Sequence, residues 1–113
     1  MVYDTAKRLA AELQQSAEYQ SYRTLRDTVT ENATTKSLLD EYHRLQLQAQ
    51  AAAVQGTPND ELLQKLQKLG EVLQFDKDAA EFLIAEYRMN RMLADVYKIL
   101  AEAIDIDLGA LEA

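Results

Sequence analysis

The side chains that could take part in chemistry are few, and they do not form a catalytic set. The chain has one histidine, His43, and no cysteine. A hydrolytic triad needs a nucleophile, a base and an orienting acid, and the sequence contains no Gly-x-Ser-x-Gly turn. The carboxylate pairs Asp40–Glu41 and Asp60–Glu61 are typical of helix ends and solvated helix faces. We therefore predict that the protein is not an enzyme.

The same residues argue against a metal or cofactor site. Asp40 and His43 are spaced to share one helix face, but a di-iron bundle site needs a Glu-x-x-His pair on each of two helices. Without cysteine, thiolate zinc sites and cysteine-ligated iron–sulfur clusters are excluded. We predict no cofactor and treat His43 as an ordinary surface or half-buried histidine. A remote alternative is an enzyme using carboxylates and tyrosines, which clustering of Asp40, His43 and Glu86 in one pocket would favour.

The charge balance disfavours nucleic acids and membranes as partners. Twelve basic and 19 acidic residues give a net charge of −7, which repels a phosphate polymer. Arg23 and Arg26 share a helix face, as do Arg88 and Arg91, but each pair is too small to form a basic patch. No apolar run approaches the roughly 20 residues that span a bilayer, and Met1–Asp4 does not resemble the start of a secretory signal. We expect a cytoplasmic protein.

The composition favours an all-α fold. The sequence is 48% hydrophobic but has only three glycines and one proline, too few for the turns that a series of strands requires. We predict an antiparallel bundle of about five helices in a single domain over residues 1–106, followed by a short tail at 107–113. The predicted helices span residues 4–15, 17–31, 35–55, 58–74 and 76–106.

Capping residues and breaks set these helix bounds. Asp4 and Ser16 can each cap the helix that follows. The segment Glu31–Thr35 is rich in side chains that bond to their own backbone, which predicts a break there. Gly70 costs about 1 kcal/mol inside a helix and marks either a close helix crossing or an early helix end.

The strongest helix-ending and helix-starting signals in the chain lie between the third and fourth predicted helices. Gly56 suits a left-handed helix stop. Thr57 or Asn59 can cap the next helix, with Pro58 in its first turn. So short a turn predicts an antiparallel helix pair.

The predicted helix at 76–106 is long for so small a protein. At 1.5 Å per residue it would extend ~45 Å, whereas a compact globule of this size is roughly 34 Å across. Part of its apolar face must therefore extend beyond the body, and a second copy would cover it. We predict a homodimer or higher oligomer. The predicted self-association residues follow one apolar series: Phe82, Met89, Met92, Val96 and Ile99.

A second group of residues is a candidate surface for other protein partners. Aromatic and arginine side chains gather on one short helix, a composition common at interfaces. Ile84 interrupts the polar stripe of the last helix, and a polar residue beside an apolar seam, such as Asn90, can fix register. The alternatives are a packed tyrosine, a lone exposed isoleucine and a solvated asparagine. The partner-binding candidates are Tyr19, Tyr22, Arg23, Ile84, Arg88 and Asn90.

Several segments, in their order along the chain, resemble a known family. They are Tyr3–Ala6, Ser16–Tyr22, Gln55-Gly56 leading into Asp60–Leu62, and Phe82–Val96. In order and spacing they are similar to the YlbF/YmcA family of small bacterial helical proteins. The resemblance spans about residues 3–106.

This resemblance implies an oligomeric, cytoplasmic and non-enzymatic all-α protein. Family members look like regulatory adaptors that assemble with paralogues and influence competence, sporulation and biofilm formation, with one proposed route through RNase Y and messenger-RNA maturation. An iron–sulfur role proposed for some members requires cysteines, which this chain lacks. We expect a self-associating regulatory adaptor. The alternative is a structural or chaperone-like protein that holds a helical or extended client in a groove.

Overall fold

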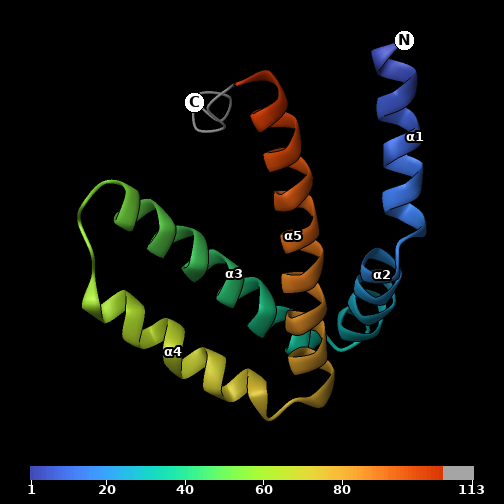
Figure 1. Ribbon diagram of the computed structural model, residues 1–113. Helices are drawn as coiled ribbons and strands as arrows, with labels where there is room; N and C mark the ends of the chain where they lie inside the picture. The colour runs from blue at the N-terminus through green and yellow to red at the C-terminus, as the bar shows by residue number, and fades with distance from the viewer. Residues whose placement is uncertain (106–113) are drawn as a thin grey trace. The chain divides into compact units, whose positions relative to one another are not determined.

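The protein is built of helices only over the part that the computed structural model describes, residues 1–105 (Figure 1). This confirms the predicted all-α class with its long last helix. Position 106 and the predicted tail at 107–113 lie outside the described residues. The five helices are α1 (Val2–Gln15), α2 (Ala17–Thr30), α3 (Ala33–Val54), α4 (Asp60–Gln74) and α5 (Lys77–Ile104).

The internal contacts divide the chain into two compact units. Unit 1 comprises residues 1–23 together with the chain from residue 84 onward, and unit 2 comprises residues 24–83. Both α2 and α5 therefore contribute to each unit. The single domain over residues 1–106 stays a prediction.

Unit 2 holds most of the buried side chains. The antiparallel helices α3 and α4 pack along each other (Figure 1) and bury Leu39, Leu45 and Leu73. The first turns of α5 add Ala79 and Phe82, and the Phe82 ring meets His43 edge-on at 6.3 Å between centroids. This unit thus has an apolar core of its own.

Gly70 lies where α3 and α4 approach closely. A Cβ atom at this position would be 3.5 Å from Cε2 of Tyr42, and α4 continues beyond it to Gln74. The early helix end is therefore wrong, and Gly70 faces the Tyr42 ring of α3 at an ordinary contact distance. Gly56 has φ +72°, which confirms the left-handed stop after α3.

Asparagine caps begin both helices of this pair. The side-chain oxygen of Asn32 accepts the backbone N–H groups of Thr34 and Thr35, each at 3.1 Å, so α3 begins at residue 33 instead of 35. Asn59 accepts the N–H of Leu62 at 3.2 Å. Because Asn59 is the cap, Pro58 precedes α4, and its predicted place in the first turn is wrong.

A hydrogen bond joins the start of α3 to the start of α5. The hydroxyl of Thr35, which is 4% exposed, donates to Oδ2 of Asp76 at 2.7 Å. The other carboxylate oxygen of Asp76 accepts the N–H groups of Asp78 and Ala79 and so caps α5. These bonds, the one from Thr35 first among them, lower the pKa of Asp76.

In unit 1, a single residue, Ser16, forms the corner between α1 and α2. Its backbone is extended, with φ −67° and ψ 150°. Its hydroxyl donates to the carbonyl of Leu13 at 2.6 Å and accepts the N–H of Tyr19 at 3.2 Å, which confirms its predicted role as a cap. The Gln20 side chain adds a bond to the carbonyl of Gln14 at 2.7 Å. The direction in which α1 leaves α2 is therefore fixed by three bonds.

The start of α1 differs from the prediction. The helix begins at Val2 with Met1 as its cap, and no side chain caps it. Asp4 instead lies in the first turn, 3.7 Å from the N-terminal ammonium. The backbone carbonyl of Met1 accepts the N–H groups of Asp4 and Thr5, so the helix begins without a capping side chain.

Candidate protein-interaction site

The part of α5 that belongs to unit 1 leaves a wide apolar face uncovered. Of its described residues, only Ala85 is buried, at 5% exposure. Further along the helix, Ile99 is 66% exposed and Ile104 is 63% exposed. The apolar stripe of a helix is its usual packing surface, so this face is a candidate contact surface.

A shallow groove of about 420 Å³ runs along this face. Its floor is apolar, and Glu18 at the start of α2 forms part of the opposite wall. At its edge, Nε of Arg91 lies 3.5 Å from Oδ1 of Asp95. The groove is lined by Glu18, Tyr87, Arg88, Arg91, Met92, Asp95, Val96 and Ile99. An amphipathic helix, apolar on one side and charged at its edges, fits such a surface.

The structure brings several of the predicted self-association residues together. Met92, Val96 and Ile99 lie in the groove, and Met89 is half-buried on the same helix. Phe82 differs, because it is 4% exposed and lies in the core of unit 2 against His43. We therefore leave Phe82 out of the candidate surface.

The predicted partner-binding residues are more scattered. Arg88 lines the groove, and it also lines a smaller hollow with Ala17, Glu18, Ser21 and Ala85. The other candidates lie outside the groove: Tyr19 and Tyr22 are half-buried, whereas Arg23, Ile84 and Asn90 are exposed.

Sequence reasoning did not select four of the groove residues. Tyr87, Arg91 and Asp95 lie beside the apolar series on α5, and Arg91 and Asp95 belong to the predicted polar stripe of that helix. Glu18 comes from another helix, so no periodicity within α5 could have pointed to it. The signal for Tyr87 was available, since it interrupts the polar stripe as Ile84 does.

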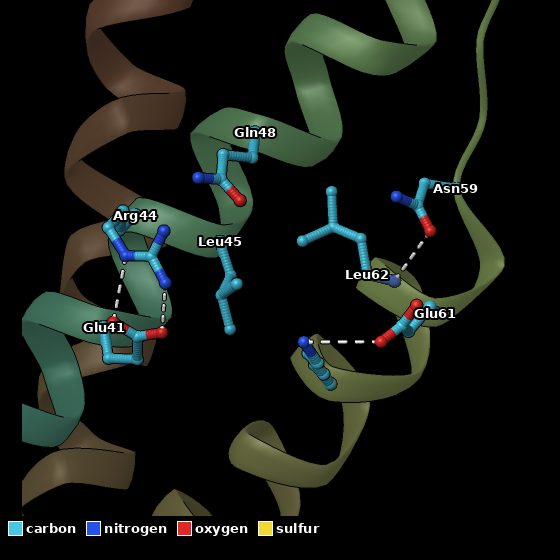
Figure 2. Close-up of a pocket in the computed structure, with 8 residues that line it drawn as sticks. Glu41, Arg44, Leu45, Gln48, Asn59, Glu61 and Leu62 are labelled. Atoms are coloured by element: carbon cyan, nitrogen blue, oxygen red, sulfur yellow. Dashed lines mark hydrogen bonds and ion pairs between the residues drawn. The ribbon is translucent and has the colours of Figure 1, made fainter.

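A second pocket, of about 310 Å³, lies between α3 and the start of α4 in unit 2 (Figure 2). It is polar, and its charges pair locally. Nε of Arg44 donates to Glu41 at 3.0 Å, and Nζ of Lys65 lies 3.6 Å from Glu61. The hydrogen bond from Arg44 lowers the pKa of Glu41 and raises that of Arg44. We interpret these pairs as surface pairs of the α3–α4 hairpin.

The geometry gives no support to metal chemistry around His43. Asp40 pairs with Lys36 at 2.8 Å. The described residues hold no group of three or more histidine, aspartate or glutamate side chains that could bind a metal ion. Among residues 1–105, no helix combines the length and the apolar character needed to cross a membrane.

The fold matches that of a solved bacterial protein. A chain in the crystal structure of Bacillus subtilis RicA in complex with RicF superposes with a TM-score of 0.58. The match covers 92% of this chain and 93% of that one at 19% sequence identity. The class is thus that of small all-α proteins with the fold of this structure.

The sequence narrows that class to a family. Residues 2–105 match the family described as control of competence regulator ComK, YlbF/YmcA. A UPF0342 protein of Symbiobacterium thermophilum is 36% identical, over 95% of this chain and 96% of that protein. Another, of Halothermothrix orenii, is 35% identical over 95% and 92%. The chain belongs to the YlbF/YmcA family, which confirms the resemblance found in its sequence.

Proposed function

We propose that this protein is a non-enzymatic regulatory adaptor of the cytoplasm that associates with itself and with partner proteins. One observation carries the proposal: beyond Ala85, none of the described residues of α5 is buried. A monomer would leave Ile99 66% exposed and Met92 and Val96 only half-buried, whereas fully burying an exposed side chain of this kind is worth about 1.5–3 kcal/mol. Binding to another protein would cover this apolar face, and this role requires no catalytic residues.

Membership of the family supports one kind of partner, namely other proteins of the same family. RicA, in the structure that shares this fold, is in complex with RicF, and the family's description concerns control of competence. We propose that this chain binds family paralogues and, through them, takes part in RNase Y-dependent messenger-RNA processing. Competence, sporulation and biofilm formation would be the processes affected.

Affinity purification from the native cell tests this role. The tagged protein should recover family paralogues and RNase Y, and Ile99→Asp should reduce that recovery at least tenfold. Leu47→Asp is the matched control, because Leu47 on α3 is 67% exposed, as Ile99 is 66% exposed, but lies outside the groove. Recovery of neither class of partner would overturn the proposal, and so would equal losses in the two variants.

The open groove also favours a second candidate function, the holding of a helical or extended client segment. Its apolar floor of Met92, Val96 and Ile99 could bind a segment that is not part of a folded partner. A chaperone-like protein would suppress the aggregation of an unfolded client at equimolar amounts, and Ile99→Asp would abolish that effect. An adaptor would leave the aggregation unchanged.

A further inference from the structure

Unit 1 has a second uncovered apolar face, on α1. This helix has no buried residue, and it does not pack along α5. Its apolar side chains nevertheless follow one stripe, with Leu9 and Leu13 half-buried and Val2 79% exposed. Two amphipathic helices of unit 1, α1 and α5, therefore each have an apolar face that no other described element covers.

The two uncovered faces have the same spacing. Along α1, the stripe steps by four, three and four residues, and along α5 the stripe from Met92 to Ala103 does the same. Such steps form a seam that packs knobs into holes. If the two helices run antiparallel, every residue of one stripe meets one of the other in a layer. The layers are Leu13 with Met92, Leu9 with Val96, Ala6 with Ile99, and Val2 with Ala103.

The flanks of this register are compatible with burial. On one side, Tyr3 lies level with Leu100 and Ala10 with Leu93, so that flank is apolar. On the other side, Glu12 lies beside Asp95; this like-charged pair stands at the exposed edge of the seam, where Arg91, 3.5 Å from Asp95, offsets part of the charge. The helices are also matched in length, since 14 residues of α1 reach ~21 Å, enough to cover all four layers.

The bonds at Ser16 bear on whether α1 packs on the α5 of its own chain or on the α5 of a second copy. The bonds of the Ser16 hydroxyl to Leu13 and Tyr19, with that of Gln20 to Gln14, hold α1 in a direction that leaves its stripe off the α5 of its own chain. Laying α1 on that helix would require other backbone angles at Ser16 than the observed φ −67° and ψ 150°. A second copy can bring its α5 to the stripe with the corner intact.

We propose that α1 of one copy packs antiparallel on residues 92–103 of α5 of a second copy, and reciprocally, so that the two pairs form a four-helix core. The proposal rests on the self-association in the proposed function and names its surface. Each copy contributes Val2, Tyr3, Leu9 and Leu13 from α1, and Met92, Val96, Ile99 and Leu100 from α5. Val2, Tyr3, Ile99 and Leu100 are 51–79% exposed and the other four side chains are half-buried, so covering both helices contributes apolar area toward the roughly 800 Å² per partner of a stable interface.

Disulfide trapping tests this pairing directly, because the chain has no cysteine of its own. Ala6→Cys and Ile99→Cys are co-expressed as two single variants, one carrying a mass tag, and then oxidised. The proposal predicts a disulfide between the tagged and untagged chains in most of the mixed dimers, which random pairing makes half of all dimers. Ala11→Cys with Ile99→Cys is the control, because Ala11 lies on the opposite side of α1 from Ala6, and its yield should be at least fivefold lower.

The outcomes separate this pairing from self-association in general. Equal yields for Ala6 and Ala11 in a protein that light scattering shows to be a dimer would overturn the α1–α5 pairing alone. The double variant Ala6→Cys/Ile99→Cys, oxidised at monomer mass into an intramolecular disulfide, would overturn it in favour of closure within one chain. A monomeric mass for the unmodified protein would overturn the self-association on which the pairing rests.

Discussion

The Thr35 hydroxyl donates a hydrogen bond of 2.7 Å to the Asp76 carboxylate, across 41 positions of the sequence. Thr35 is buried, and Asp76 at the same time caps α5 through the N–H groups of Asp78 and Ala79. One carboxylate thereby ties the first turn of α3 to the first turn of the long helix. Unit 2 holds the N-terminal end of α5 through this bond as well as through its apolar core.

Replacing Thr35 with valine should destabilise the protein, because it keeps the shape of the side chain but removes the hydroxyl donor. Loss of one partner of a hydrogen bond to a charged group costs about 1–3 kcal/mol. Urea denaturation followed by circular dichroism measures the change in the free energy of unfolding. Thr34→Val is the control, since Thr34 is the neighbouring exposed threonine. Equal effects of the two variants would contradict a role for the bond.

The same bond predicts how stability responds to acid. The pKa of Asp76 in the folded protein lies below its ordinary value of 3.8, chiefly because Thr35 donates to the charged form. A lowered folded-state pKa adds stability that is present above the unfolded-state value and is lost as the pH falls through the folded-state value. The free energy of unfolding should therefore decline below about pH 4. Asp76→Asn should make that decline smaller, and an unchanged decline in denaturation series from pH 7 to pH 2 would refute the assignment.

The two glycines of the α3–α4 hairpin, Gly56 in its turn and Gly70 within α4, should respond in opposite ways to alanine. A Cβ at Gly70 would stand 3.5 Å from the Tyr42 ring, an ordinary contact distance, so Gly70→Ala should stabilise α4 by about 0.5–1 kcal/mol. Gly56 has φ +72°, where an L side chain is strained, so Gly56→Ala should destabilise by about 1–2 kcal/mol. Thermal denaturation shows whether each variant is more or less stable than the unmodified protein. A loss of stability in Gly70→Ala would mean that the crossing tolerates no extra methyl group.

Local signals predicted the helices well, because the atoms that set each bound are close in sequence. Ser16 and Asn59 act as caps through bonds to N–H groups three residues away, and the stop at Gly56 needs only its own backbone angle. The errors arose at two helix starts, those of α1 and α4. At α1 the carbonyl of Met1 accepts the N–H groups in place of a side chain, and at α4 Asn59 displaces Pro58 from the helix.

The candidate site was predictable only in part, because periodicity shows that a face is apolar but not which element covers it. Phe82 and Ile99 belong to one continuous series on α5. Phe82 is covered by its own chain, whereas Ile99 is 66% exposed. The packing of Phe82 against His43 is a long-range contact that the helical pattern does not contain. The contribution of Glu18 to the groove is long-range in the same way.

The Arg88 guanidinium at the groove should matter for partner binding more than for the fold. It is exposed on α5, so Arg88→Glu should leave the melting temperature within about 2 °C, as surface substitutions usually do. The reversed charge should reduce the recovery of protein partners severalfold in affinity purification. Arg8→Glu, an exposed arginine on the polar side of α1, is the charge-matched control. Equal recovery with both variants would remove Arg88 from the proposed surface.

The solution mass of the protein tests most directly whether it works by association through α5. For a chain of 12.8 kDa, light scattering at micromolar concentration should give at least twice that mass. Val96→Asp should bring the mass down to that of one chain while circular dichroism shows the helical content retained. A mass of one chain for the unmodified protein at these concentrations would contradict the account, as would a variant that keeps the oligomeric mass with its helices intact.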